Sequence, residues 1–159
     1  MIGDAKWYLG GASNYTSSSN GLASHFYSYE RGTAVYNSSR STNWIGKVGL
    51  IYPSDYGYAT SGGNSRNRAS CMAKELYSWD DSSYSDCKNN DWLLNTSQDQ
   101  WTMSPRAVDS DHVFHVDSAG VVYDRYAFDT LAGRPVVHLK STIKVISGSG
   151  TTSSPYILG

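Results

Sequence analysis

The sequence is poor in the residues that build long helices. Of its 159 residues only two are Glu and six are Lys, whereas 26 are Ser and 15 are Gly. Ser favours turns and helix caps, and Gly weakens helix interiors. These proportions exclude a helix bundle or a coiled coil.

Aliphatic side chains are also scarce, because Leu, Ile, Val and Phe together supply only 28 residues. So small a share is typical of disordered chains only when the net charge is high. Here 13 basic residues face 14 acidic ones, and 13 Tyr and 5 Trp replace the missing aliphatic bulk. We therefore expect one folded domain over residues 1–159, with a core that includes Trp7, Trp44, Tyr52 and Trp92.

Two kinds of partner are disfavoured by what is missing. No apolar run approaches the ~20 residues that span a bilayer, so we expect no membrane contact by this segment. No basic block is present, which removes the electrostatic basis for binding nucleic acid. The first residues have no signal-peptide pattern, which is compatible with the removal of an upstream segment.

The chain has only two cysteines, Cys71 and Cys87. The segment 71–87 that they bracket is rich in Ser and Asp, and burial alone would hold such a loop poorly. A disulfide would stabilise the fold by ~3 kcal/mol in the loop-entropy model. We predict this disulfide, with two buried free thiols as the alternative. A disulfide would in turn favour an extracellular or cell-surface location.

The hydrophobic pattern predicts an α+β fold in which antiparallel strands dominate the second half. Short helices are expected over 25–30 with Ser24 as N-cap, over 55–59 with Ser54 as N-cap, and over 72–79. A hairpin turn is expected at 117–120. Strands are expected over 5–9, 44–52, 92–94, 100–103, 113–116, 121–123, 135–139 and 142–146.

Motifs for catalysis and for metal binding are missing. The sequence has no GxSxG, HExxH or CxxC pattern, so we expect no enzyme activity and no resident cofactor. His112 and His115 have HxxH spacing, but in a strand they would point to opposite faces. Calcium is retained as an alternative because acidic residues recur in Ser-rich loops, although turn chemistry also explains them: Asp80, Asp81, Asp86, Asp91, Asp109 and Asp111.

The most informative segment is 117–129, where Tyr, Asp, Ser and Arg follow one another on a hairpin and the next loop. Tyr supplies a large contact area at low entropic cost, and Ser and Asp supply adaptable hydrogen bonds, as in antibody binding sites. The alternative is that Tyr123, Tyr126 and Phe128 simply fill the core of a domain poor in aliphatics.

Four ordered motifs resemble an uncharacterised extracellular domain family of surface and pilin-like proteins from gut Gram-positive bacteria. They lie at 46–59, 101–105, 133–140 and in the tail from Gly148 to Leu158. The resemblance implies a C-type-lectin-like fold, related to retroelement-diversified variable proteins and to formylglycine-generating enzymes. It also implies that the ligand faces the segment 115–129.

The sequence departs from these relatives in two respects. The calcium-dependent sugar motifs of C-type lectins are missing, because Asn90, Asp91 and Trp92 stand in the wrong order. The reactive cysteine pair of the formylglycine-generating enzymes has no counterpart, because no cysteine follows Cys87. The likeness to those enzymes therefore transfers no chemistry.

The sequence thus predicts a non-enzymatic adhesion domain on a bacterial surface or pilus-like filament, with a protein or glycan ligand on a host or neighbouring cell. The alternatives are a structural filament subunit and, less favoured, an enzyme of the formylglycine-generating fold. We expect the 71–87 insertion to flank the site, and Arg134 and Pro135 to be structural. The predicted ligand-binding residues are Trp101, His115, Asp117, Ser118, Tyr123, Asp124, Arg125, Tyr126, Phe128 and Asp129.

Overall fold

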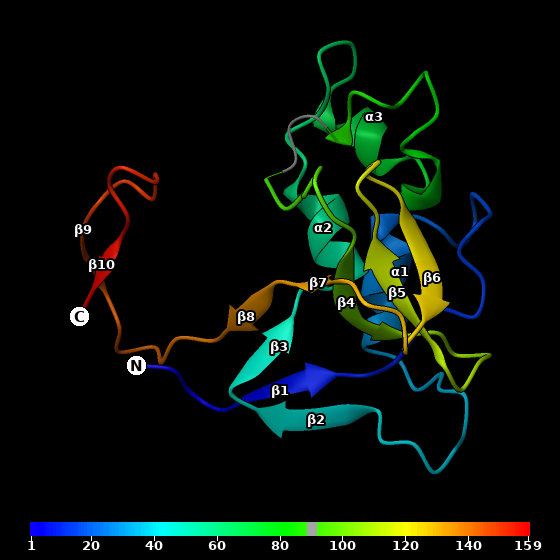
Figure 1. The fold of residues 1–159 in the computed structure, drawn as a ribbon, viewed down its shortest axis with the longest axis horizontal. Helices are drawn as coiled ribbons and strands as arrows, with labels where there is room; N and C mark the ends of the chain where they lie inside the picture. Colours follow the sequence, from blue (N-terminus) through cyan, green and yellow to red (C-terminus); the bar gives the residue numbers. More distant parts are fainter. Residues whose placement is uncertain (89–91) are drawn as a thin grey trace.

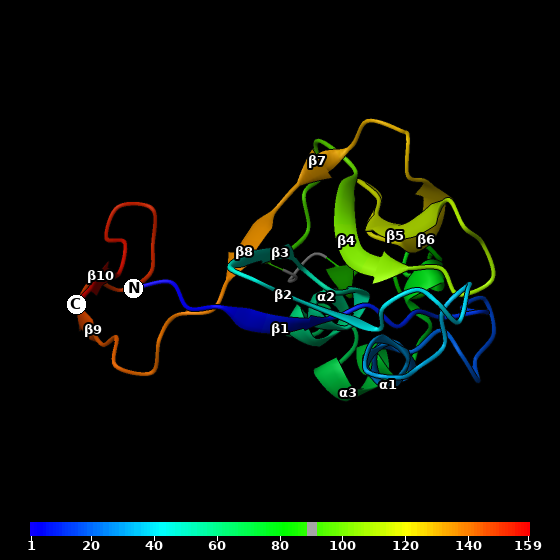
Figure 2. The same ribbon diagram turned by 90° about the horizontal axis from the view of Figure 1, so that it is seen from below.

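A four-stranded sheet lies over three short helices in the body of the molecule (Figures 1 and 2). The computed structural model describes residues 1–88 and 92–159. The sheet has the strand order β6-β5-β4-β7, with β7 parallel to β4 and the other pairs antiparallel. The predicted mixed α+β class is confirmed. The strands are β4 (Gln100–Pro105), β5 (His112–Val116), β6 (Val122–Tyr126) and β7 (Ala132–Gly133).

Three smaller pairs of strands complete the fold, and each pair is antiparallel. The first two run across the body, and the third forms an arm that projects from it together with the two chain ends (Figures 1 and 2). The pairs are β1 (Ala5–Tyr8) with β2 (Asn43–Gly46), β3 (Val48–Leu50) with β8 (Pro135–Val137), and β9 (Val145–Ser147) with β10 (Ile157–Leu158).

The predicted strand over 44–52 is two strands. β2 pairs with β1, whereas β3 pairs with β8, so the chain changes its partner at Lys47. The predicted strand over 142–146 also differs, because β9 begins only at Val145. A turn precedes it, in which Ile143 N–H donates to the carbonyl of Lys140. Long-range pairing rather than local pattern sets both limits.

Helices α1 (Ala23–Glu30) and α2 (Pro53–Ala59) each begin earlier than predicted. Leu22 rather than Ser24 is the N-cap of α1. In α2, Pro53 occupies the first turn, where its missing N–H costs nothing. The Asp55 carboxylate accepts the Tyr52 N–H at 2.9 Å, which completes the start of the helix.

The predicted helix over 72–79 does not form. Helix α3 (Arg68–Met72) has Asn67 as its N-cap, whose side chain accepts the Ser70 N–H, and it ends where the predicted helix should start. A single 3-10 turn, η1 (Leu76–Ser78), follows. Leu76 N–H donates to the Gly21 carbonyl at 2.9 Å, so a tertiary hydrogen bond replaces the helical one.

Aromatic side chains fill much of the core, as the composition predicts. Phe26 of α1 meets Phe114 of β5 edge to face at 5.2 Å, and Tyr56 of α2 lies 5.5 Å from Trp79. The predicted members Trp7 and Tyr52 are buried. Trp44 and Trp92 are not, at 45% and 74% exposed, and the predicted strand over 92–94 is a turn.

The predicted disulfide between Cys71 and Cys87 is confirmed, and both residues are fully buried. It closes the segment that contains the buried Trp79. Ser65 N–H and hydroxyl donate to the Asp86 carboxylate at 2.9 and 2.7 Å, which ties the same segment to the loop after α2. Within the described ranges, no helix has the length and hydropathy needed to cross a membrane.

The first residues of the chain pair with the segment after β8. Ile2 forms a β-bridge with Leu139. Gly3 N–H donates to the His138 carbonyl, and Lys140 N–H donates to the Met1 carbonyl, each at 3.0 Å. The two chain ends therefore lie close together at the arm (Figure 1).

Candidate functional site

The predicted ligand-facing segment 115–129 folds as the end of β5, the hairpin turn, β6 and the loop after it. The turn over 117–120 forms as predicted. Asp117 shapes it by accepting the Val121 N–H at 2.9 Å, and Gly120 completes it with a positive φ of 88°. The Asp117 carboxylate therefore stabilises the turn, and it is also partly exposed to solvent at the edge of the turn.

The rings of Tyr126 and Phe128 form an exposed stack at the end of β6. Their centroids lie 4.9 Å apart with an interplanar angle of 12°, and the rings are 46% and 77% exposed. His112 of the neighbouring strand β5 lies 4.2 Å from Tyr126. We call His112, Tyr126 and Phe128 the aromatic stack; it presents flat apolar faces to solvent, which a core role does not explain.

Charged and polar groups of the same segment gather around Asp99. Arg125 pairs with Asp99 at 3.1 Å and with Asp129 at 3.7 Å, and Ser118 N–H donates to Asp99 at 2.9 Å. Ser118 and Arg125 help to line a polar hollow of about 560 Å³ between this turn and the segment 130–132. The structure therefore brings these three predicted residues together, and it adds Asp99, which the sequence reasoning missed.

Asp124 is held within the protein. It accepts a hydrogen bond from the Tyr15 hydroxyl and pairs with Arg106 at 2.9 Å. Burial and the Asp124 carboxylate raise the pKa of Tyr15 well above its ordinary value. Asp124 is thus engaged in joining β6 to the N-terminal loop.

A row of three predicted residues crosses the sheet. Trp101 of β4 lies opposite His115 of β5, and His115 lies opposite Tyr123 of β6. His115 is buried and packs edge-on against Trp101 at 6.2 Å, whereas Tyr123 is exposed. Burial lowers the pKa of His115, which favours its neutral form. Trp101 and His115 therefore support the site from within, and Tyr123 reaches solvent.

One cluster has donor atoms at metal-binding distances. Single ligand atoms of Asp109, His112 and Asp124 lie within 4.8 Å of one another, the only such grouping in residues 1–88 and 92–159. However, the Arg106 guanidinium lies between the carboxylates, at 3.0 Å from Asp109 and 2.9 Å from Asp124. Arg106 offsets part of their negative charge, and the cluster offers too few oxygens for calcium.

Of the other acidic residues considered for calcium, Asp81 and Asp86 already accept hydrogen bonds, and Asp111 lies beside the cluster at His112. Asp81 accepts the Ser83 N–H in a local turn, and Asp86 accepts two hydrogen bonds from Ser65. Asp111 contacts His112 at 2.9 Å. Asp91, and with it the sequence Asn90-Asp91-Trp92 as a unit, lies outside the described residues.

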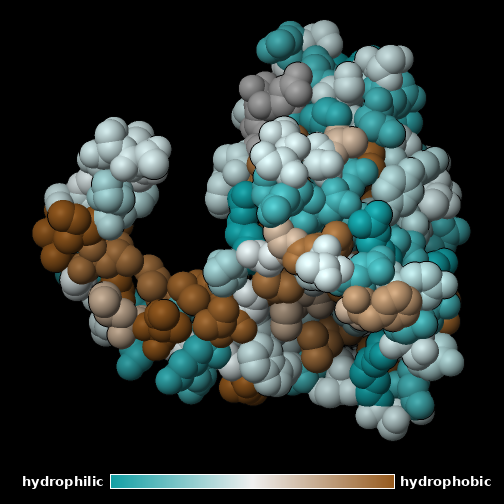
Figure 3. Space-filling model, in the orientation of Figure 1, coloured by the Kyte–Doolittle hydropathy of each residue, from teal (hydrophilic) through white to brown (hydrophobic). Residues whose placement is uncertain are grey.

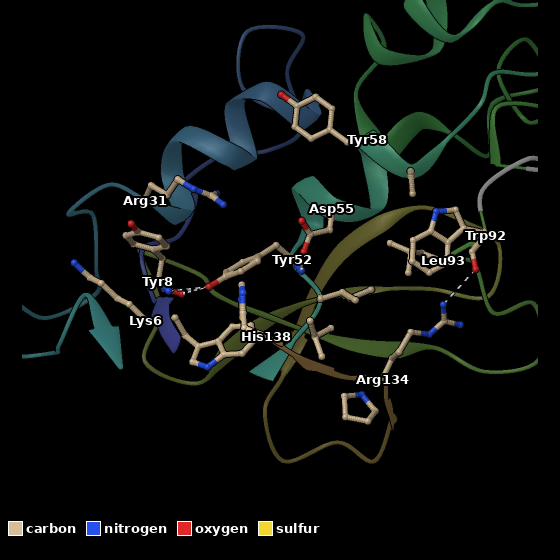
Figure 4. Close-up of a pocket in the computed structure, with 15 residues that line it drawn as sticks. Lys6, Tyr8, Arg31, Tyr52, Asp55, Tyr58, Trp92, Leu93, Arg134 and His138 are labelled. Atoms are coloured by element: carbon tan, nitrogen blue, oxygen red, sulfur yellow. Dashed lines mark hydrogen bonds between the residues drawn. The ribbon is translucent and has the colours of Figure 1, made fainter. Parts of the chain in front are cut away.

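A cavity larger than the polar hollow lies elsewhere, between β1, α2 and β8 (Figure 4). We call it the Arg31 cleft; its volume is about 650 Å³. None of the predicted ligand-binding residues line it. Its walls come from five separate segments: Lys6, Trp7, Tyr8, Arg31, Ile51, Tyr52, Asp55, Tyr58, Ala59, Trp92, Leu93, Arg134, Pro135, Val136 and His138.

Tyrosine rings surround Arg31 at one end of this cleft. The guanidinium carbon lies 3.6 Å from the Tyr27 ring centroid and 5.3 Å from that of Tyr8. The Tyr52 hydroxyl donates to the Tyr8 carbonyl at 3.1 Å, which fixes the neighbouring wall. Burial raises the pKa of Tyr52 to about 12, so its phenol stays protonated.

The sequence contained one signal for this cleft, the succession Tyr52, Asp55 and Tyr58 at one-turn spacing beside Pro53. That segment lies within the family-like motif at 46–59. The motif indicates a family resemblance, and it does not by itself indicate that these side chains line a cleft. Comparison of the chain with family models, curated proteins and solved structures finds no match.

Proposed function

We propose that this protein is a non-enzymatic recognition domain that works outside the cytoplasm and binds a protein or glycan on another cell. The observation that carries the proposal is the exposed, nearly parallel pair of Tyr126 and Phe128 at the end of the edge strand β6. Flat aromatic side chains held at fixed positions are typical anchors of binding surfaces. The flanking charges of Arg125 and Asp129 would supply selectivity.

A C-type-lectin-like fold and a place on a bacterial surface or pilus-like filament belong to the same proposal. The four family-like motifs and the short helices beside antiparallel strands support the fold. The Cys71–Cys87 disulfide is consistent with an oxidising compartment.

Replacement of the two stacked rings tests the contact surface. The double variant Tyr126→Ala/Phe128→Ala should lose binding to host cells and to immobilised glycans, while its unfolding transition stays close to that of the wild type. Tyr36→Ala is the matched control, because Tyr36 is a comparably exposed aromatic residue outside the segment 115–129. Unchanged binding by the double variant would remove the proposed surface.

A second candidate function, assembly into a filament, is favoured by the arm. Hydrophobic side chains gather on it in Figure 3, and Val145, Ile146 and Ile157 are exposed. A two-stranded hairpin alone is marginally stable in water, so an apolar hairpin of this kind benefits from a covering partner. If a second copy covers it, the protein should self-associate in sedimentation experiments, and Ile146→Asp should abolish that association.

A further inference from the structure

The Arg31 cleft is unused by the proposed function and differs from the aromatic stack in its chemistry. Figure 4 shows Lys6, Tyr8 and Arg31 at one end and Trp92 and Arg134 at the other, with Tyr52, Asp55 and His138 between them. Both ends therefore combine a cation with an aromatic ring, and a ligand that fills the cleft meets the same pair of groups twice.

The lining carries an excess of positive charge. Among the described residues of the lining, Lys6, Arg31 and Arg134 are basic, and Asp55 alone is acidic. Asp55 already accepts the Tyr52 N–H. Within the described part of the chain, Lys6 and Arg134 form no ion pair, and Lys6 lies over the Tyr8 ring at 5.3 Å. The cleft is therefore suited to an anionic ligand.

The Arg31 guanidinium is oriented by its surroundings before any ligand arrives. Its Nη1 donates to the Glu30 carboxylate at 3.1 Å and to the Tyr27 carbonyl at 3.3 Å, while the Tyr27 ring supports its face. A guanidinium held in this way loses little conformational freedom when it binds a carboxylate. This end of the cleft is preorganised for a planar anion.

The aromatic rings indicate the rest of the ligand. Trp92 is 74% exposed beside the cleft, and Tyr8 and Tyr58 are half-buried in its walls. The negative face of such a ring attracts the slightly positive C–H groups on the flat side of a pyranose. Phenol hydroxyls, an imidazole and basic nitrogens along the same walls match the hydroxyl groups of a sugar.

We propose that the Arg31 cleft binds an acidic oligosaccharide: Lys6 and Arg31 hold the carboxylate of one uronic acid unit, and a neighbouring unit lies against Trp92 beside Arg134. This site is independent of the aromatic stack, so either can fail without the other. The cleft has a volume of about 650 Å³ and basic side chains at both of its ends, so an oligosaccharide fits it better than a single sugar unit.

A pair of probes that differ only in charge tests this inference. Trigalacturonic acid is added to the ¹⁵N-labelled protein, and its methyl ester, which keeps the shape and removes the carboxylates, is added separately. The free acid should shift the indole N–H signals of Trp7 and Trp92, and the ester should bind about tenfold more weakly. Binding of the acid should also weaken as salt is raised.

Variants locate the site. Lys6→Gln and Arg134→Gln should each weaken the binding of trigalacturonic acid several-fold, and Trp92→Ala should do the same; all three side chains are exposed in part, so folding should survive. Phe128→Ala serves as the control and should leave this affinity unchanged, whatever it does to cell binding.

Four results would overturn the inference. They are equal binding of acid and ester, no binding of the acid at millimolar concentration, signal shifts confined to residues outside the cleft, and binding of benzoate with none of the saccharide. The last result would assign the cleft to aromatic acids.

Discussion

The carboxylate of Glu30 accepts hydrogen bonds from both the backbone N–H and the hydroxyl of Ser54, at 3.0 and 2.5 Å. This contact joins the last residue of α1 to the first turn of α2, and Glu30 is fully buried within it. Burial raises the pKa of Glu30 to about 7, against the smaller opposing effects of Ser54 and Arg31. The junction of the two helices is therefore sensitive to pH.

Stability should fall as this group ionises. The folded-state pKa of about 7 lies above the ordinary value of 4.5, so the folded protein binds the proton more tightly. The stabilisation is present below pH 4.5 and is lost as pH rises through 7. The unfolding free energy should drop by about 3 kcal/mol over that range. Glu30→Gln should flatten the profile in urea unfolding, and parallel profiles would contradict the assignment.

Loss of the disulfide should destabilise the protein. The double variant Cys71→Ala/Cys87→Ala removes the covalent closure of a Ser- and Asp-rich segment, which should lower the unfolding free energy by about 3 kcal/mol. Chemical unfolding monitored by tryptophan fluorescence measures this, since Trp79 lies inside the segment and is buried. A thiol assay on the protein unfolded without reductant should find no reactive cysteine; two reactive thiols would refute the bridge.

Gly49 and Gly133 differ in the space that a Cβ atom would find at each position. A Cβ at Gly49 would lie 2.5 Å from the Trp7 ring, and that ring is buried and anchored by its indole N–H to the Gly46 carbonyl. Gly49→Ala should therefore destabilise the protein by about 1–3 kcal/mol. At Gly133 the nearest atom is Leu50 Cδ2 at 3.8 Å, so Gly133→Ala should leave the melting temperature nearly unchanged. Equal melting temperatures for the two variants would exclude this packing.

Removal of one hydroxyl should loosen the N-terminal loop from the sheet. Tyr15→Phe deletes the donor to Asp124 and leaves that carboxylate with Arg106, at a cost of about 1–3 kcal/mol in thermal unfolding. Burial keeps the Tyr15 phenol protonated at high pH. The variant should therefore leave the absorbance titration of tyrosine unchanged up to about pH 11. A lost titrating phenol would show that Tyr15 is exposed.

Features with a local cause were accessible from the sequence. The turn at 117–120 depends on Asp117 and Gly120, which are neighbours in the chain, and it forms as predicted. The cysteine pair similarly depends on two residues and their spacing. In contrast, the helix expected over 72–79 is lost to a hydrogen bond from Leu76 to Gly21, which lies far away in the sequence. No local pattern carries that information.

The aromatic stack and the Arg31 cleft also differ in how far the sequence alone predicts them. Exposure of Tyr126 and Phe128 agrees with their polar neighbours, a local signal. The partners of Asp124 are Tyr15 and Arg106, and only the folded chain reveals that this carboxylate is engaged. The Arg31 cleft is assembled from five segments, and Trp92, one of its two tryptophans, is predicted from the sequence to lie in the core. Its discovery required the fold.

The pairing of the first residues with the segment after β8 has a mechanical consequence. The Met1–Lys140, Ile2–Leu139 and Gly3–His138 contacts are antiparallel, and both chain ends leave from the same side. A pull on the two ends would load the Lys144–Gly159 pair of the arm as well as this ladder, and the contacts of the ladder would open one after another rather than shear together. Tension would thus be relieved in this short ladder before it reached the disulfide-closed body that carries the aromatic stack.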